Sequence, residues 1–149
     1  MLFYQAMFSV LVADDDPQLL EMVCEAFTRM NANVVRASSG ADLIEQLATA
    51  GPFDLVVTDI SMPWMSGLQA MRATRSAGLA TPVIIMTAVR DKRVAARVKS
   101  LGKNVVLLRK PFQLSALESA ASMLLSGRRS EGESSREPCA RVEQQGTKV

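Results

Sequence analysis

Histidine is absent from this sequence, and cysteine occurs only twice, at Cys24 and Cys139. Because zinc sites are built largely from histidine and cysteine ligands, this composition argues against a zinc centre. Two distant cysteines also provide no disulfide framework of the kind that holds small secreted domains together. We therefore expect no zinc and no structural disulfide, and the expected location is the cytoplasm.

Long hydrophobic runs are missing as well. No apolar stretch approaches the roughly 20 residues that a membrane-spanning helix needs. The apolar opening, residues 1–8, lacks the basic segment and the small-residue cleavage site of a signal peptide, so we interpret it as an irregular lead into a first strand. A chain of 149 residues with 48% hydrophobic and 21% charged residues is typical of one soluble globular domain with no membrane partner.

Short apolar runs alternate with amphipathic segments along the chain. The apolar runs predict strands over residues 9–13, 33–37, 55–58, 83–86 and 105–108. The amphipathic segments predict helices over about residues 17–30, 40–50, 67–77, 91–101 and 113–125. Strict alternation of this kind predicts an α/β fold, with a parallel sheet between two helical layers. For five such units, right-handed crossovers favour the doubly wound, flavodoxin-like strand order 2-1-3-4-5.

The predicted domain covers residues 8–126. From Gly127 onward the chain is polar and has no hydrophobic periodicity, so residues 127–149 are predicted to form a disordered tail. The stretch after Ser126 is too short and too polar to supply a helix-turn-helix module. We therefore expect no output domain and no DNA-binding module, and direct DNA binding through the fourth predicted helix has no support beyond its basic charge.

Charged and polar side chains stand where the predicted strands end. They are Asp14, Asp15 and Asp16 after the first strand, Asp59 after the third, Thr87 after the fourth and Lys110 after the fifth. In open α/β sheets, ligands bind outside the carboxyl ends of the strands. The first and third strands would flank the point where the strand order reverses, so we expect their carboxylates to converge.

Converging carboxylates need a cation, because two of them about 4 Å apart repel each other by about 4 kcal/mol at an effective dielectric constant near 20. Oxygen ligands without histidine or thiolate suit Mg²⁺, which binds through one or two carboxylates, waters and phosphate oxygens. A lysine and a threonine hydroxyl opposite could bind the same phosphate oxygens. This set predicts phosphoryl transfer to a carboxylate, in which catalysis consists mainly of positioning and charge neutralisation.

Four segments carry a family resemblance. They are Leu11–Pro17, Asp54–Pro63 with Gly67 and Leu68 after it, Pro82–Ala88, and Arg109–Phe112. With their spacing, these segments resemble the receiver domain of bacterial two-component response regulators, the CheY-like family. The resemblance covers about residues 8–126 and implies a phosphoprotein of two-component (phosphorelay) signal transduction.

The resemblance also implies roles for individual residues. Asp59 would be the phosphoacceptor. Asp15 would bind Mg²⁺ directly and Asp14 mainly through water, together with Asp59 and the backbone carbonyl of Ser61. Lys110 would pair with the phosphoryl group, and the Lys110–Pro111 peptide bond would be cis.

The remaining implications concern signalling. Thr87 would move to bond the phosphoryl oxygen. The phosphoryl donor would be a sensor histidine kinase or a phosphotransfer protein. A downstream protein partner would bind the face formed by the fourth helix, the fifth strand and the fifth helix. The domain would catalyse its own phosphorylation and the slow hydrolysis of its phosphoryl group, without being an enzyme with turnover. Whether phosphorylation also produces a homodimer is a question that the sequence leaves open.

Two departures from the family pattern affect the expected switch. The family usually has an aromatic residue three positions before the lysine, where this chain has Leu107. A leucine cannot report through ring burial or a tyrosine hydroxyl, so the hypothesis is that switching depends more on the loop Ala88–Lys92. The stretch from Gly102 to Lys110 is also one residue longer than usual, which predicts a bulge or a longer loop before the fifth strand.

Charge is divided unevenly along the chain. Residues 1–59 carry nine acidic residues against Arg29 and Arg36, whereas residues 88–110 carry eight basic residues against Asp91 alone. A basic patch of this kind fits nucleic acid, an acidic partner or simply a solvated helix face. One basic helix without interleaved aromatic residues does not decide among them.

Two other functions compete with the receiver interpretation. Asp14 and Asp16 have the spacing of the nucleophile motif of haloacid dehalogenase-type phosphatases, with Thr87 and Lys110 as later motifs. However, Gln18 replaces the usual threonine or valine, and no acidic pair follows Lys110. The chain could also be the receiver segment of a larger regulator or of a hybrid histidine kinase.

Overall fold

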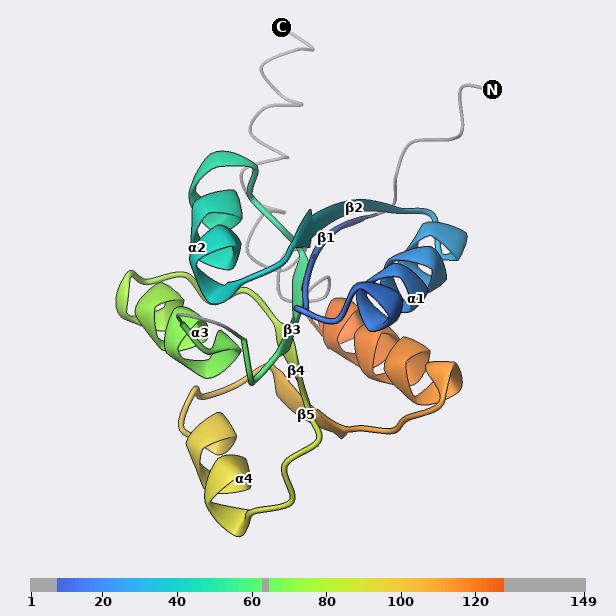
Figure 1. The fold of residues 1–149 in the computed structure, drawn as a ribbon. Coiled ribbons are helices and arrows are strands. Elements are labelled where there is room, and N and C mark those ends of the chain that lie inside the picture. Colours follow the sequence, from blue (N-terminus) through green and yellow to red (C-terminus); the bar gives the residue numbers. More distant parts are fainter. Residues whose placement is uncertain (1–7, 63–64, 128–149) are drawn as a thin grey trace, which may run out of the picture.

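The structure, a computed structural model, describes residues 8–62 and 65–127. Within these residues, parallel strands form a single sheet in the order β2-β1-β3-β4-β5 (Figure 1). The strands are β1 (Phe8–Ala13), β2 (Ala32–Ala37), β3 (Leu55–Asp59), β4 (Val83–Thr87) and β5 (Val105–Arg109). The predicted fold class and strand order are confirmed.

Helices cover both faces of the sheet. They are α1 (Pro17–Arg29), α2 (Gly40–Thr49), α3 (Gly67–Ser76), α4 (Lys92–Lys99) and, after β5, a helix over residues 114–127. Helix 114–127, drawn in orange, lies beside α1 on one face, whereas α2, α3 and α4 cover the other (Figure 1). This arrangement leaves the carboxyl ends of the strands uncovered by helices and joined only by loops.

The first four helices each begin at a residue whose side chain accepts a hydrogen bond from the first turn. These N-caps are Asp16 for α1, Ser39 for α2, Ser66 for α3 and Asp91 for α4. Short side chains with an oxygen are favoured there because they satisfy backbone N–H groups that have no partner inside the helix. Asp16, which the sequence places just before Pro17 at the start of the first helix, accepts the Gln18 N–H at 3.0 Å.

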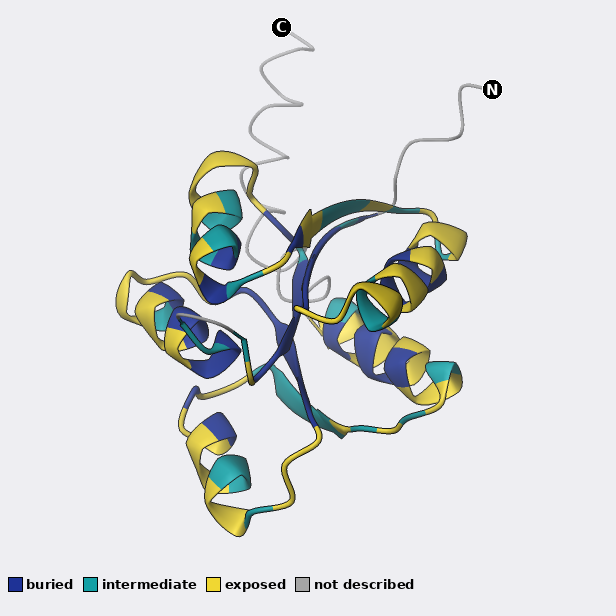
Figure 2. Ribbon diagram, in the orientation of Figure 1, coloured by how far each residue is buried: buried dark blue, intermediate teal, exposed yellow. Residues whose placement is uncertain are grey.

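Two hydrophobic cores lie on the two faces of the sheet. Alternate strand residues such as Val12, Val57 and Met86 pack against Phe27 of α1 and Leu117 of helix 114–127. The intervening residues pack against α2, α3 and α4, and this second core includes Leu11, Val56, Ile85, Leu43, Met71 and Val98. Figure 2 shows the buried central strands β1, β3 and β4 between helices whose outer faces are exposed. The near-continuous apolar strands of the sequence are therefore strands covered on both faces.

The structure departs from the prediction mainly around α4. This helix spans Lys92–Lys99, inside the predicted range of 91–101. Pairing between β4 and β5 runs without a bulge from Val83 opposite Val105 to Thr87 opposite Arg109. The additional residue is therefore accommodated by the loop before β5, where Gly102 (φ 97°) and Asn104 (φ 61°) are left-handed.

Three smaller predictions can be compared with the described residues. The Lys110–Pro111 peptide bond is cis, as predicted, and Gly51–Pro52 is also cis, which was not predicted. The predicted disordered tail lies outside the described residues except for Gly127, which belongs to helix 114–127. Within the described ranges, every helix is too short or too polar to cross a membrane.

Candidate functional site

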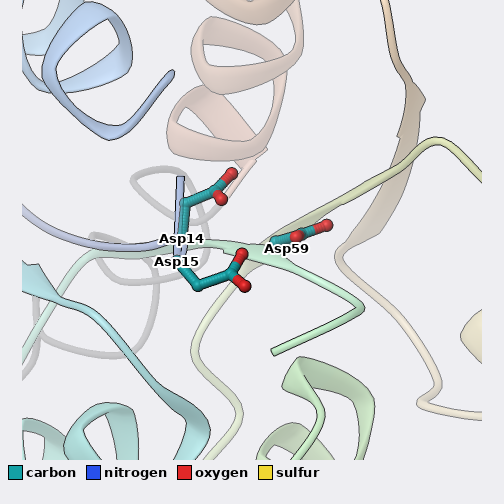
Figure 3. Close-up of side chains that lie close together, drawn as sticks. All are labelled: Asp14, Asp15 and Asp59. Atoms are coloured by element: carbon teal, nitrogen blue, oxygen red, sulfur yellow. The ribbon is translucent and has the colours of Figure 1, made fainter. Parts of the chain in front are cut away.

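Three carboxylates gather at the carboxyl ends of β1 and β3 (Figure 3). Asp14 and Asp15 follow β1 directly, and Asp59 is the last residue of β3. One carboxylate oxygen of each lies within 4.8 Å of the others. The strands are direct neighbours, with Ala13 opposite Thr58, so their pairing brings the carboxylates together. The predicted convergence is therefore present.

Lys110 extends into this cluster from the end of β5. Its Nζ lies 3.1 Å from Oδ2 of Asp14 and 3.3 Å from Oδ1 of Asp59. An ammonium group between two carboxylates offsets part of their mutual repulsion. The Lys110 backbone N–H donates to the carbonyl of Thr87 at 2.8 Å, which ties the end of β5 to the end of β4. The lysine is thus placed where it contacts both carboxylates.

The two aspartates after β1 differ in environment. Asp14 is 1% exposed, and both of its oxygens have partners, since Oδ1 accepts the Asp16 N–H at 2.9 Å and Oδ2 faces Lys110. Asp15 is exposed. Asp14 is therefore fixed within the protein, whereas Asp15 is accessible to solvent and to an incoming ion.

Asp59 is almost fully buried, at 6% exposure. Burial, followed by repulsion from Asp14, raises the pKa of Asp59, while Lys110 and a hydrogen bond from the Ser61 backbone act in the opposite direction. Ser61 itself lies just after the strand and is exposed. An ionised Asp59 is thus destabilised by its surroundings, and an added cation would relieve that cost.

Gly67 holds the backbone of the Asp59 segment in place. Its N–H donates to the carbonyl of Ile60 at 3.2 Å. A Cβ at this position would lie 2.1 Å from the carbonyl oxygen of Asp59 and 2.6 Å from Oγ1 of Thr58. Only glycine fits this close approach between the start of α3 and the end of β3. The sequence contained this glycine in a family-like motif, but its contact with the Asp59 backbone was not predicted.

Thr87 closes β4 next to β3 and is fully buried, at 0% exposure. Its Oγ1 accepts the backbone N–H of Val89 at 2.9 Å. The carbonyl of Val89 in turn lies 3.4 Å from a guanidinium nitrogen of Arg109. The predicted switch residue is therefore connected to the loop Ala88–Lys92 named in the switching hypothesis and, through it, to the end of β5.

Leu107 lies apart from this cluster. It is opposite Ile85 in the β4–β5 pair and packs, partly buried, against the core on the α2, α3 and α4 side. Asp16 is used as the cap of α1, so it is not a member of the three-carboxylate cluster. The side chains that meet at one site are those of Asp14, Asp15, Asp59 and Lys110. Ser61 and Thr87 are tied to it through backbone hydrogen bonds, to Asp59 and Lys110 respectively.

Oxygen donors of this kind fit Mg²⁺. The cluster supplies carboxylates only, one of them exposed, and no sulfur or nitrogen ligand. A hard cation that keeps several waters suits such a set. A buried carboxylate, a lysine beside it and a threonine hydroxyl on the next strand are groups of the kind that can accept and hold a phosphoryl group.

Comparison with protein families decides the classification. The profile of the response regulator receiver domain matches residues 10–122. The chain belongs to this family. A receiver domain of this length accounts for all the described strands and for the carboxylate cluster.

Relatives and solved structures agree with the receiver assignment. The Regulator of RpoS from Escherichia coli is 32% identical over 108 residues, covering 72% of this chain and 32% of that protein. The swarming motility regulation protein RssB of Serratia marcescens is 37% identical over 110 residues, covering 73% and 49%. The chemotaxis response regulator CheY4 of Vibrio cholerae superposes with a TM-score of 0.72 at 26% identity, covering 80% and 99%. The chain thus spans from about a quarter to about a half of the length of the curated relatives it matches.

Proposed function

We propose that this receiver domain accepts a phosphoryl group on Asp59 and thereby changes its affinity for a protein partner. The observation that carries the proposal is the contact set at Asp59, a buried carboxylate within 4.8 Å of two others and 3.3 Å from Lys110. The phosphoryl donor would be a histidine kinase or a phosphotransfer protein. We expect the protein to act in the cytoplasm.

The proposed reaction forms one bond and breaks one. A carboxylate oxygen of Asp59 attacks the phosphorus of a phosphohistidine. The P–N bond breaks, its electrons return to the imidazole, and an aspartyl phosphate forms. In the slower dephosphorylation, water attacks the phosphorus of the aspartyl phosphate. The bond between phosphorus and the Asp59 oxygen breaks, inorganic phosphate leaves, and the carboxylate is restored. The domain carries out both steps on itself, so we do not class it as an enzyme with turnover.

The proposed ligands of Mg²⁺ are Asp15, Asp14, Asp59 and the backbone carbonyl of Ser61. When bound, this ion would supply positive charge against the carboxylates and the phosphoryl oxygens. The engaged oxygens of Asp14 and the exposed position of Asp15 support direct binding by Asp15 and water-mediated binding by Asp14.

Lys110 and Thr87 would stabilise the phosphoryl group once it is attached. Lys110 already lies between Asp14 and Asp59, so its ammonium group would pair with a phosphoryl oxygen with little rearrangement. The Thr87 hydroxyl now accepts the Val89 N–H and has a proton to donate. Binding of the phosphoryl group by Thr87 would therefore pull on the β4–α4 loop.

The proposed downstream surface is formed by α4, β5 and helix 114–127. Phosphorylation changes partner binding at this surface only if the contacts with the partner differ between the phosphorylated and the unphosphorylated state. The Thr87–Val89 bond leads from the site to the segment just before α4, which supports this surface as the one that responds. A homodimer that forms on phosphorylation would likewise require contacts between the two copies that differ between the two states.

The phosphatase alternative is weakened by the use of Asp16. In a haloacid dehalogenase-type enzyme, the second aspartate of the motif would face the substrate. Here the Asp16 side chain accepts the Gln18 N–H as the cap of α1. A phosphomonoesterase assay separates the two functions, because sustained turnover that Asp14→Asn abolishes and Asp59→Asn does not would favour the phosphatase.

Intact mass measurement tests the proposal directly. The full chain is incubated with a small phosphodonor, such as acetyl phosphate, and Mg²⁺. We expect one added phosphoryl group on the wild-type chain, none on Asp59→Asn, and normal labelling of Asp16→Asn as the matched control. Labelling should also disappear when Mg²⁺ is chelated. No added mass on the wild type, or unchanged labelling of Asp59→Asn, would overturn the proposal.

A further inference from the structure

Exposed positive charge is concentrated in one segment of this chain. The described segment 88–109 contains seven exposed basic residues, namely Arg90, Lys92, Arg93, Arg97, Lys99, Lys103 and Arg109. Of these, only Arg93 forms a salt bridge among the described residues, with Asp91. On the opposite side of the sheet, by contrast, both Arg29 and Arg36 are paired with glutamates. Apart from Arg93 and from Arg109, which bonds the Val89 carbonyl, the basic residues of segment 88–109 therefore contribute charge that no ion pair within the described residues offsets.

The α4 helix presents this charge around an open hollow. The hollow, of about 220 Å³, is lined by Asp91, Arg93, Val94 and Arg97. Arg93 and Arg97 are one helical turn apart, so both guanidinium groups border the same hollow. The side chain of Arg93 is 85% exposed although it contacts Asp91. The hollow thus offers two accessible guanidinium groups and a partly buried valine.

The electrostatics of α4 favour an added anion. Lys92 and Arg93 stand in its first turn, where no acidic residue is present. The N-terminal end of a helix carries partial positive charge, so cations there are unfavourable and an anion is stabilising. Asp91, the N-cap, offsets part of this positive charge through Arg93, and contact with an anionic partner would offset more of it.

We infer that the α4 hollow binds a carboxylate-bearing, acidic segment of a protein partner. The guanidinium group of Arg97 would pair with a carboxylate of the partner, and Arg93 would add positive charge beside its contact with Asp91. An apolar side chain of the partner would contact Val94. This inference rests on the proposed function only in taking the α4 side as the signalling surface. The charge pattern itself does not depend on phosphorylation.

Two other occupants fit less well. Single-stranded nucleic acid is bound through exposed aromatic side chains on which bases stack. The described aromatic residues are instead buried or partly buried, and they are Phe8, Phe27, Phe53 and Phe112. A second copy that met this surface symmetrically would place like charges opposite each other, which is repulsive.

The test measures binding of labelled peptides to the full, unphosphorylated chain by fluorescence anisotropy. The probes are a glutamate–leucine decapeptide, its glutamine–leucine counterpart, and single-stranded and duplex oligonucleotides. We expect the glutamate peptide to bind, the glutamine peptide not to bind, and added salt to weaken binding. The double substitution Arg93→Glu/Arg97→Glu should weaken glutamate peptide binding by about tenfold or more.

A charge-matched control separates a site from general attraction. Arg29→Glu/Arg72→Glu makes the same change in net charge at exposed positions on α1 and α3, and should change binding less than about twofold. Equal loss in both double variants, or tighter binding of an oligonucleotide than of the glutamate peptide, would overturn the inference. So would concentration-dependent self-association that only Arg93→Glu/Arg97→Glu abolishes. Asp59→Asn should still bind the glutamate peptide, so a failure of phosphorylation at Asp59 is distinguishable from a failure of this site.

Discussion

Asp59 combines two features that both disfavour its ionised form, a buried side chain and a second carboxylate beside it. Burial and then repulsion from Asp14 raise the pKa of Asp59. A carboxyl group whose pKa is raised on folding binds its proton more tightly in the folded chain than in the unfolded one. The free energy of unfolding therefore falls as the pH rises between the unfolded and the folded pKa, and the loss persists above that interval.

Replacing Asp59 by asparagine should remove this penalty. In the absence of Mg²⁺ at pH 7, we expect Asp59→Asn to raise the free energy of unfolding by on the order of 1 kcal/mol, or the Tm by about 4 °C. The contribution of Asp59 to the fall in stability from acid to neutral pH should also disappear. Thermal unfolding at a series of pH values, followed by circular dichroism, measures both effects.

Asp16→Asn is the matched control, because Asp16 is exposed and asparagine is an equally good N-cap. Its stability should stay within about 0.5 kcal/mol of the wild type. Added Mg²⁺ should stabilise the wild type more than Asp59→Asn, since a ligand stabilises the state that binds it. A lower Tm for Asp59→Asn than for the wild type at pH 7 without Mg²⁺ would contradict this account of Asp59.

Gly67→Ala should damage the site through the backbone. The added Cβ would lie 2.1 Å from the carbonyl oxygen of Asp59, so α3 and the end of β3 must separate. We expect a loss of stability of about 1–3 kcal/mol, typical of overpacking, together with slower labelling of Asp59. Urea denaturation measures the first effect and intact mass over time the second. Ala73→Ser, at an exposed position on the same helix, should change neither, and a Gly67→Ala protein as stable as this control would show that the contact can relax.

At the scale of elements, the β4–α4 loop is the segment most directly connected to the site. Its residue Val89 bonds the buried Thr87 hydroxyl through its N–H, and its carbonyl lies near Arg109. Leu107, by contrast, packs against a core cluster and has no polar group with which to follow Thr87. A movement of Thr87 is therefore passed on most directly through the loop.

Beryllofluoride, which stands in for the phosphoryl group, should change the loop Ala88–Lys92 and leave Leu107 in place. Backbone amide shifts in this loop and the methyl shifts of Leu107, compared with and without beryllofluoride and Mg²⁺, measure the two responses. Thr87→Ser keeps the hydroxyl and should keep the loop response, whereas Thr87→Val should lose it. An unchanged loop combined with a rotated Leu107 would refute the hypothesis.

The order of elements was predictable because it depends on local patterns. Apolar runs of strand length, separated by capped amphipathic segments, allow only a few topologies, and residues such as Asp14, Asp59 and Lys110 then follow from their places at strand ends. Asp16 was also predictable as a cap, since the side chain acts on its own helix. Convergence of the site followed from the parallel sheet.

Other features depend on contacts between distant segments and were not predictable. The fit of Gly67 against Asp59 becomes visible only when α3 is placed on β3. The bond from Val89 to Thr87 depends on the course of a loop without a repeating pattern. The cis bond at Gly51–Pro52 was missed because an X–Pro sequence alone permits both isomers at a small energy difference.

At the scale of the whole molecule, the two cores share one sheet. Phe27 of α1 belongs to one core and Leu43 of α2 to the other, and both are 0% exposed. Each strand contributes alternate side chains to both cores, so neither core can be lost while the sheet that the other needs remains intact. Small single domains with such shared elements usually unfold in one cooperative step.

Phe27→Ala and Leu43→Ala should therefore each lower the midpoint of one common unfolding transition, rather than of two separate transitions. We expect losses of about 3–5 kcal/mol for Phe27→Ala and about 2–5 kcal/mol for Leu43→Ala, because each leaves a cavity in a packed core. The two residues lie on opposite faces of the sheet, in separate clusters, so their effects should add within about 0.5 kcal/mol in a double variant that still folds.

Urea unfolding, followed both by circular dichroism and by Mg²⁺-dependent labelling of Asp59, measures these losses and shows whether the protein unfolds in one step. Coincident midpoints for the two probes are expected in each variant, whereas loss of labelling well before loss of helix signal would show that the site edge unfolds independently of the sheet.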